Sequence, residues 1–267
     1  MVAVHATAVV ERDAELAEDV QIGPYCVVGP EVRLGAGVRL ASHVVIAGRT
    51  TIGAGSRIFS FASIGTIPQD MKYRGEPSEL RVGANSVIRE YVTMNPGTEA
   101  GNMLTRVGDH GLFMIGVHIA HDCTVGDHVV MANNATLGGH VSIADYAILG
   151  GLSAVHQFVR IGRHAIVGGM TGVENDVIPY GSVTGNRARL SGLNIVGLKR
   201  RGFSRDDVQA LRKAYRLLFA PEGTMAERLE DVAQLFADNA AVMEVVSFIR
   251  ADSPRALCQP RDGHDDP

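Results

Sequence analysis

An aliphatic residue recurs at every sixth position along most of the chain. The positions run through Val4, Val10, Leu16, Ile22, Val28, Leu34, Leu40, Ile46, Ile52, Ile58 and Ile64, and after an interruption they continue from Val107 to Val173. A helix repeats at about 3.6 residues and an ordinary strand at about 2, so neither fits this period. The period is typical of a solenoid in which three hexads close one triangular coil, and equivalent residues of successive coils then stack on strands about 4.8 Å from one another. We therefore expect residues 1–190 to form a parallel β-helix around a ladder of aliphatic side chains.

The repeat fails in two places. In residues 66–80 the hexad positions fall on Asp70 and Glu76, which predicts a loop of roughly one coil's length outside the rod. In residues 96–106 the phase slips by one residue, which indicates a second projecting loop. Loops on a rigid scaffold often carry functional residues.

After Pro179 the hexads end and a helical pattern follows. Ser204 with Asp207 and Thr224 with Glu227 resemble capping boxes that open two helices, and a third helix is expected over 240–250. The sequence therefore predicts a helical domain over residues 191–267. Its tail from Leu257 has no apolar period and is expected to be frayed.

Composition argues against several classes of function. The formal net charge of -4 gives no basic surface for nucleic acid. No apolar run reaches the roughly 20 residues of a membrane span, and the first residues lack the basic start and the cleavage site of a signal peptide. Cys26, Cys123 and Cys258 are widely spaced and form no CxxC motif, so neither a disulfide framework nor a zinc site is indicated. We expect a cytoplasmic protein that uses no metal and no cofactor.

Histidines gather in a strongly repetitive part of the rod, at His118, His121, His140 and His156. The remaining histidines are expected to be outward-facing polar residues: His5, His43, His110, His128, His164 and His264. Because His121, Gly139 and Gln157 are spaced by three hexads, which is one coil, they should stack along one edge of the rod. Acyl transfer to a hydroxyl needs an imidazole that accepts a proton and an N–H that stabilises an oxyanion, and this edge offers both. Cys123 could form an acyl-enzyme, but its hexad position is the small inward one, which favours a core residue.

Ordered motifs give a resemblance to a known family. The chain resembles the UDP-N-acetylglucosamine acyltransferases, which catalyse the first step of lipid A biosynthesis, in QDMKYRGEP (69–77), HIAHDC (118–123), ANNATLGGHV (132–141), AVHQFVRIG (154–162) and GLKRRGF (197–203). The resemblance covers nearly the whole chain. It implies that the coil is left-handed and that the protein is a homotrimer with active sites between neighbouring subunits. It also implies transfer of an (R)-3-hydroxyacyl group from acyl carrier protein to the 3-hydroxyl of UDP-N-acetylglucosamine.

The resemblance implies roles for individual residues as well. His121 matches the general base, Asp122 the carboxylate that orients it, and Gly139 the backbone oxyanion donor. Residues that match the lining of the sugar-nucleotide and acyl pocket are Gln69, Asp70, Lys72, His118, His140, His156 and Gln157. Asn194, Arg200 and Arg201 match the segment that contacts the nucleotide and the carrier protein, and a guanidinium pair suits phosphates and an acidic partner. Gly169 and Met170 lie where the family has its acyl-chain ruler.

Two departures from the family pattern bear on the acceptor. Residues 94–98 read MNPGT where many members have a histidine and an arginine, and Val196 stands where some have an acidic residue. Either change could alter nucleotide contacts or favour a 3-amino analogue over the 3-hydroxyl.

Other functions on the same repeat fit less well. The N-acyltransferase later in the pathway normally has an additional N-terminal uridine-binding domain, whereas hexads begin here at Val4. A zinc lyase needs three histidines across adjacent strands, but the positions stacked on His121 are glycine and glutamine. A purely structural solenoid would show regular outward threonine or serine ladders and no projecting loops.

Overall fold

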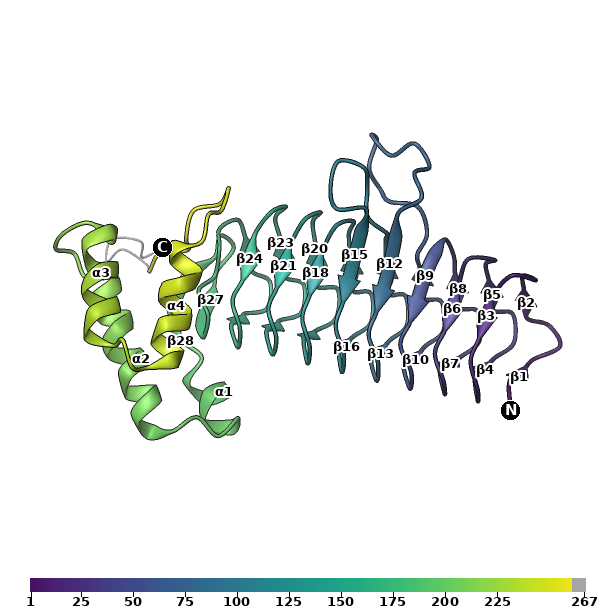
Figure 1. The fold of residues 1–267 in the computed structure, drawn as a ribbon, viewed down its shortest axis with the longest axis horizontal. Helices are drawn as coiled ribbons and strands as arrows, with labels where there is room; N and C mark the ends of the chain where they lie inside the picture. The colour runs from purple at the N-terminus through teal and green to yellow at the C-terminus, as the bar shows by residue number, and fades with distance from the viewer. Residues whose placement is uncertain (261–267) are drawn as a thin grey trace.

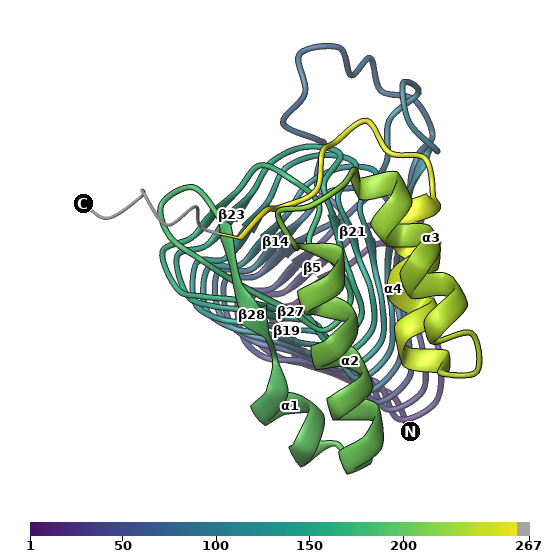
Figure 2. The same cartoon turned by 90° about the vertical axis from the view of Figure 1, so that its left-hand side faces the viewer.

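The chain forms a rod of short parallel strands with helices at its C-terminal end (Figure 1), in a computed structural model that describes residues 1–260. Along the rod axis the coils trace a triangle, so the strands form three sheets, one on each face of a prism (Figure 2). The predicted left-handed parallel β-helix of hexapeptide repeats, followed by helices, is confirmed.

The three sheets are numbered here by the first strand that each contains. Sheet 1 holds β1 (Ala3–Val4), β4 (Gln21–Ile22), β7 (Arg39–Leu40), β10 (Arg57–Ile58), β13 (Val87–Ile88), β16 (Leu112–Phe113), β19 (Val130–Met131), β22 (Ile148–Leu149), β25 (Ile166–Val167), β27 (Gly181–Thr184) and the antiparallel β28 (Arg189–Leu193). Sheet 2 holds β2 (Val9–Val10), β5 (Val27–Val28), β8 (Val45–Ile46), β11 (Ser63–Ile64), β14 (Thr93–Met94), β17 (His118–Ile119), β20 (Thr136–Leu137), β23 (Ala154–Val155) and β26 (Gly172–Val173). Sheet 3 holds β3 (Glu15–Leu16), β6 (Arg33–Leu34), β9 (Arg49–Ile52), β12 (Glu79–Val82), β15 (Leu104–Val107), β18 (Thr124–Val125), β21 (Ser142–Ile143) and β24 (Arg160–Ile161).

Strand register follows the repeat and locates the two loops. Val130 pairs with Ile148, three hexads later, as one coil requires. Ile52 pairs with Val82, five hexads later, so the first interruption adds two hexads to its coil and not the full coil that the sequence suggested. Val82 pairs with Val107, four hexads and one residue later, so the second interruption adds one hexad and the predicted slip. Both loops leave after a strand of sheet 2 and return at a strand of sheet 3, and they project together from that edge of the rod (Figures 1 and 2).

The core is the predicted aliphatic ladder with small residues beside it. Ile46, Ile64 and Ile119 are fully buried, and the narrow corners of the prism are filled by residues such as Cys26 and Cys123. The Cys123 side chain has no exposed surface, and burial raises the pKa of its thiol to about 12. The prediction that Cys123 is a core residue is confirmed, and its thiol is not the thiolate that an acyl-enzyme mechanism would require.

Aromatic and imidazole rings stack at successive turns between sheets 3 and 1. His110 stacks on His128 with ring centroids 4.7 Å apart, and the column continues through Tyr146 to His164. His5, His43 and His110 are exposed, as predicted. The prediction for His164 is wrong, because His164 is 3% exposed and Phe203, which lies between the first two helices, packs edge-on against its ring at 5.2 Å. His264 lies outside the described residues.

In the described part of the chain, four helices follow the rod: α1 (Ile195–Arg200), α2 (Arg205–Leu218), α3 (Met225–Leu235) and α4 (Ala240–Arg250). Ser204 caps α2 through the Asp207 N–H, and Thr224 forms a full capping box with Glu227 at α3, so both predicted helix starts are confirmed. The helix expected over 240–250 is confirmed as α4, whereas α1 was not predicted. Within residues 1–260, no helix has the length and apolar character to cross a membrane.

Residues 256–260 return to the last coil of the rod. Cys258 N–H donates to the Asp176 carbonyl at 2.8 Å, Leu190 N–H donates to the Gln259 carbonyl at 2.9 Å, and Cys258 is buried. The expectation of a frayed tail is therefore wrong for residues 257–260, because backbone pairing replaces the missing apolar period. The rest of that tail, residues 261–267, lies outside the described residues.

Candidate active site

The edge between sheets 2 and 3 collects most of the predicted site residues on successive coils. His121 lies in the turn from β17 to β18, Gly139 in the next coil, and Gln157 in the coil after that. His140 N–H donates to the His121 carbonyl at 3.0 Å, and Phe158 N–H donates to the Gly139 carbonyl at 3.2 Å. The stacking that the one-coil spacing predicts for His121, Gly139 and Gln157 is therefore observed.

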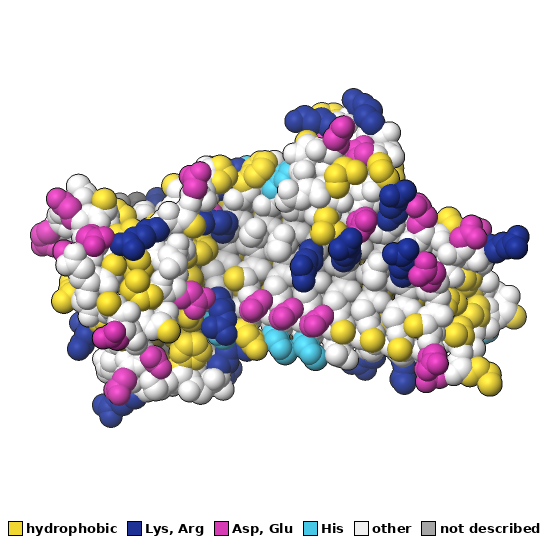
Figure 3. All heavy atoms as spheres, viewed as in Figure 1, with side chains coloured by type: hydrophobic (Ala, Val, Ile, Leu, Met, Phe, Trp, Pro, Cys, Tyr) yellow, Lys and Arg dark blue, Asp and Glu magenta, His cyan; other side chains and the backbone are white. Residues whose placement is uncertain are grey.

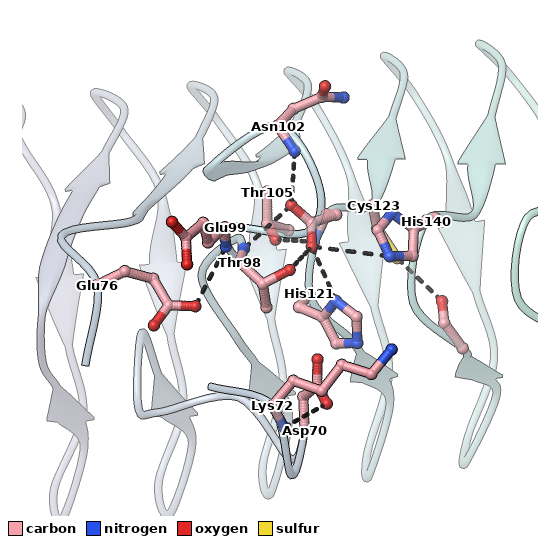
Figure 4. Close-up of polar contacts among 12 residues, drawn as sticks. Asp70, Lys72, Glu76, Thr98, Glu99, Asn102, Thr105, His121, Cys123 and His140 are labelled. Atoms are coloured by element: carbon pink, nitrogen blue, oxygen red, sulfur yellow. Dashed lines mark hydrogen bonds and ion pairs between the residues drawn. The ribbon is translucent and has the colours of Figure 1, made fainter. Parts of the chain in front are cut away.

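A buried carboxylate anchors this edge. The Asp122 side chain has no exposed surface, and its Oδ1 accepts the N–H groups of Thr98 at 3.1 Å and Asn102 at 3.0 Å. Its Oδ2 lies 2.6 Å from the Thr98 hydroxyl, which donates to it, and 2.8 Å from Nδ1 of His121 (Figure 4). The Asp122 N–H donates to the Thr105 hydroxyl at 2.8 Å. The loop between β14 and β15 thus closes around the carboxylate.

These contacts keep the carboxylate ionised. Burial alone would raise the pKa of Asp122, but the hydrogen bonds from Thr98, His121 and the backbone outweigh burial and lower that pKa. An ionised carboxylate only accepts hydrogen bonds, so the proton of the neutral His121 ring lies on Nδ1. The Nε2 lone pair then lies on the side of the ring where Asp70 and Lys72 lie (Figure 4).

Gly139 lies against the Cε1–Nε2 side of this imidazole. A Cβ at position 139 would lie 2.5 Å from Cε1 and 2.6 Å from Nε2 of His121, so only glycine leaves the ring in place. Gly138 N–H and His140 N–H both donate to neighbouring coils. Within residues 1–260, no hydrogen bond from the Gly139 N–H is found, which leaves a donor beside the lone pair of His121.

Two further imidazoles flank His121. Burial lowers the pKa of His118, whose Nδ1 lies 2.7 Å from the Thr93 hydroxyl. Burial also lowers the pKa of His140, whose ring meets His121 edge-on at 5.1 Å and stacks on Phe158 at 4.5 Å. Both are therefore neutral at pH 7 and act as hydrogen-bonding groups.

His121, Asp122 and His140 have ligand atoms within 4.8 Å of one another, a spacing at which a metal could bind. The donor atoms argue against that use. Nδ1 of His121 already donates to Oδ2 of Asp122, and the carboxylate accepts three other hydrogen bonds. The geometry suits an oriented base better than a metal centre.

The loop between β11 and β12 brings Gln69, Asp70 and Lys72 to the same edge. Asp70 Oδ1 accepts the Lys72 N–H at 2.9 Å, and the side chains of both residues reach toward His121 (Figure 4). Basic side chains lie at the tip of the projecting loops (Figure 3). Lys72 and Arg74 of the first loop are both exposed. Glu76 ties the two loops together, because its Oε1 accepts the Glu99 N–H at 3.1 Å.

Other predicted site residues lie elsewhere in the same chain. Arg201 places its guanidinium 4.5 Å from the Tyr146 ring centroid, at the edge between sheets 3 and 1, and Arg200 is exposed on α1 beside it. Asn194 uses both ends of its amide in protein contacts, since Oδ1 caps α1 and Nδ2 donates to the His164 carbonyl. Gly169 and Met170 lie in a turn between sheets 1 and 2.

Sequence reasoning missed the partners of Asp122. Thr98 and Asn102 lie in the segment where the repeat slips, and that slip was the only available signal. Thr98 ends the MNPGT segment, and Asn95 in the same segment donates from Nδ2 to the Thr66 carbonyl at 2.9 Å. The MNPGT segment therefore joins the two loops through Asn95 and binds the Asp122 carboxylate through Thr98. Arg255 was also missed, and it lies beside His156.

Comparisons with known proteins agree with this geometry. Residues 13–48 match the bacterial transferase hexapeptide family, and residues 176–258 match the family described as UDP N-acetylglucosamine O-acyltransferase, domain 2. An acyl-[acyl-carrier-protein]–UDP-N-acetylglucosamine O-acyltransferase of Bartonella henselae is 49% identical over 258 residues, which are 97% of this chain and 94% of the relative. The protein of the same name from Caulobacter vibrioides is 58% identical over 211 residues, which are 79% of this chain and 80% of the relative.

Solved structures are similar over the same extent. A crystal structure of UDP-N-acetylglucosamine acyltransferase has a TM-score of 0.93 and 40% identity, and the match covers 98% of this chain and 100% of that one. The UDP-N-acetylglucosamine acyltransferase of Francisella novicida also gives a TM-score of 0.93, at 36% identity, over 99% of this chain and 95% of that one. Rod, loops and helices therefore all have counterparts in these structures.

Proposed function

The chain belongs to the family of acyl-[acyl-carrier-protein]–UDP-N-acetylglucosamine O-acyltransferases, and we propose how its residues carry out that transfer, the first step of lipid A biosynthesis. The reaction moves an (R)-3-hydroxyacyl group from acyl carrier protein to the 3-hydroxyl of UDP-N-acetylglucosamine. It proceeds in one displacement, without an acyl-enzyme. The observation that carries this proposal is the set of four hydrogen bonds to Asp122, because it leaves the Nε2 lone pair of His121 free.

In the first half of the step, Nε2 of His121 removes the proton of the acceptor hydroxyl while the oxygen attacks the thioester carbonyl. The imidazolium that forms is stabilised by the ionised Asp122, 2.8 Å from Nδ1. A positioned base of this kind contributes roughly 10²–10⁴-fold to the rate. In the second half, the carbon–sulfur bond breaks and the imidazolium returns its proton to the departing thiolate of the carrier protein.

Between these halves the carbonyl oxygen bears a negative charge. The Gly139 N–H lies next to His121, which is buried, and donates to that oxyanion. A donor placed in this way contributes on the order of 10²–10³-fold. The base and the oxyanion donor are thus held on adjacent coils, whose spacing is fixed by backbone hydrogen bonds.

The remaining pocket residues bind the substrates. Gln69, Asp70 and Lys72 on the loop, with His118, His140, His156 and Gln157 on the rod, line the pocket for the sugar nucleotide and the acyl chain. Lys72 places a cation near the path of the diphosphate. The neutral rings of His118 and His140 exchange hydrogen bonds with the sugar, since each neutral ring has one donor and one acceptor nitrogen.

The protein acts as a homotrimer, in which a neighbouring subunit completes each site. The segment with Asn194, Arg200 and Arg201 contacts the nucleotide and the carrier protein, and the amide of Asn194 holds α1 in place within it. Gly169 with Met170 limits the acyl chain. Arg201 and Met170 lie on edges of the rod other than the one that carries His121, which favours their use in the site of another copy. The edge between sheets 1 and 2 also exposes large apolar side chains that a partner would cover: Tyr25, Phe61, Tyr91, Leu152 and Met170. We also propose that the protein works in the cytoplasm, where both proposed substrates are made.

Purified protein offered a series of 3-hydroxyacyl carrier proteins and UDP-N-acetylglucosamine tests the proposal. Transfer to the 3-hydroxyl is expected, with one preferred chain length. A parallel reaction with the 3-amino analogue tests whether the MNPGT segment and Val196 change the acceptor. Activity with acetyl-CoA alone would redirect the assignment to another hexapeptide transferase.

A further inference from the structure

The C-terminal strap, residues 253–260, is fixed to the last coils of the rod. Asp176 N–H donates to the Ala256 carbonyl and Cys258 N–H donates to the Asp176 carbonyl, both at 2.8 Å. The Asp176 side chain is fully buried, and its Oδ2 accepts the Ser253 hydroxyl at 2.7 Å. A segment pinned by this many bonds holds its side chains in defined directions.

One side chain of the strap reaches the edge that carries the site. Arg255 Nη2 lies 2.6 Å from Nδ1 of His156, and Arg255 Nε donates to the Gln157 carbonyl at 2.9 Å. His156 and Gln157 lie in the turn from β23 to β24, on the same edge as His121 and two coils farther along. Coils are about 4.8 Å apart, so His156 lies roughly 10 Å along the rod from the base.

The contact with Arg255 decides which nitrogen of His156 carries the proton. A guanidinium has no acceptor atom and remains charged at any physiological pH, so Nδ1 must accept the hydrogen bond. The alternative partner of Nδ1 is the Gln157 carbonyl, 3.3 Å away, to which Nδ1 could only donate. Arg255 Nε donates to that carbonyl as well. Arg255 therefore disfavours the Nδ1–H tautomer both at Nδ1 and at the carbonyl to which Nδ1–H would donate.

We propose that Arg255 is a positioning residue for substrate binding, which holds His156 as the Nε2–H tautomer and so presents a donor to the sugar nucleotide. The proposal rests on the proposed function, in which His156 lines the nucleotide pocket. An Nε2–H donor is complementary to a phosphate or amide oxygen of the nucleotide, whereas an Nε2 lone pair repels it. Loss of Arg255 converts the Nε2–H donor of His156 into an Nε2 lone pair. His121 is not affected by this change.

The first test is ¹⁵N NMR of protein labelled in its histidines, because the shifts of the two ring nitrogens identify the tautomer. The signal of His156 is assigned from its loss in His156→Asn. The expected result is Nε2–H in the wild type and Nδ1–H, bonded to the Gln157 carbonyl, in Arg255→Ala. A wild-type His156 protonated at Nδ1, or an unchanged tautomer in Arg255→Ala, would overturn the proposal. This readout does not depend on turnover, so it separates failure of the inference from failure of the proposed function.

Kinetics provide the second test. Arg255→Ala is expected to raise KM for UDP-N-acetylglucosamine about tenfold, with kcat within about twofold of the wild type, because the base is untouched. Arg255→Lys keeps the charge but reaches only one of the two acceptors, Nδ1 of His156 or the Gln157 carbonyl. Its KM should therefore lie between those of the wild type and Arg255→Ala. The matched control is Gln259→Ala, because Gln259 is an exposed residue of the same strap whose side chain donates only to the Leu257 carbonyl. Its KM should stay near the wild type. A fall in kcat at unchanged KM, or an equal rise of KM in Gln259→Ala, would show that the contact with His156 is not the cause.

Discussion

Replacing Asp122 by asparagine should move the proton of the catalytic imidazole from Nδ1 to Nε2, with little change in the shape of the site. Oδ1 receives two backbone N–H groups, so the amide oxygen of the substituted side chain would remain there. The NH₂ group would then take the place of Oδ2 and donate to the Thr98 hydroxyl and to Nδ1 of His121. With Nδ1 as an acceptor, the ring proton moves to Nε2, where it blocks removal of the substrate proton.

The size of this effect follows from two losses. The wrong tautomer must be corrected before each turnover, and the imidazolium loses an ionised partner in a buried site. A carboxylate-to-amide change of this kind costs about 10⁴-fold in kcat where it has been worked out for a buried carboxylate–imidazole pair. We expect a loss of roughly 10³–10⁴-fold here, with KM for both substrates nearly unchanged.

Steady-state transfer from the preferred 3-hydroxyacyl carrier protein to UDP-N-acetylglucosamine measures this loss, and thermal unfolding measures the fold. Asp127→Asn is the matched control, since Asp127 is an exposed turn carboxylate whose Oδ1 accepts a backbone N–H at 2.7 Å on another edge of the rod. Its kcat should stay at the wild-type value. A folded Asp122→Asn enzyme that retained kcat within about tenfold would refute the tautomer argument.

Three further predictions concern the frame and the fold. Gly139→Ala places a Cβ 2.5 Å from the catalytic imidazole and should lower kcat by about 10²-fold or more. The control Gly29→Ala, whose Cβ has its nearest contact at 3.5 Å, should leave kcat unchanged. An equal loss of kcat in both variants would contradict this reasoning. His164 is buried, and burial with two nearby arginines lowers its pKa to about 4, so the unfolded state takes up its proton first as the pH falls. Stability should therefore be full above about pH 6.5 and fall by about 3 kcal/mol toward pH 4, and urea unfolding of His164→Phe should lack this component; an unchanged pH dependence would exclude it. Asp176→Ala removes a fully buried acceptor of hydrogen bonds from Arg160 and Ser253 and should cost about 3 kcal/mol in urea unfolding, and a cost below about 1 kcal/mol would show that the strap contributes little.

The rod could be predicted from the sequence because its order is periodic. Each hexad repeats the same local choice of an inward aliphatic and a small corner residue, so the register of Val130 on Ile148 follows by counting. The same count places Gly139 against His121, where the structure leaves no room for a Cβ. The length of the first loop could not be counted, since nothing in residues 66–80 shows where the coil resumes.

The hexad repeat does not predict contacts between segments that are far apart in the sequence. Thr98 and Asn102 surround Asp122 only because a loop folds back over the edge, and no spacing encodes that path. His164 reads as an ordinary turn residue, and its burial depends on Phe203 from the helical part packing over it. Arg255 lies far from His156 in the sequence, in a segment without apolar period that pairs through its backbone.

The claim that His121 is the base of a direct transfer is tested most directly by single-turnover transfer in His121→Ala. The ring lies outside the aliphatic ladder, so the variant should fold and melt like the wild type. The account predicts a transfer rate lower by about 10³-fold or more with saturating acyl carrier protein and UDP-N-acetylglucosamine. A folded His121→Ala protein that transferred the acyl group at a rate close to the wild type would contradict it.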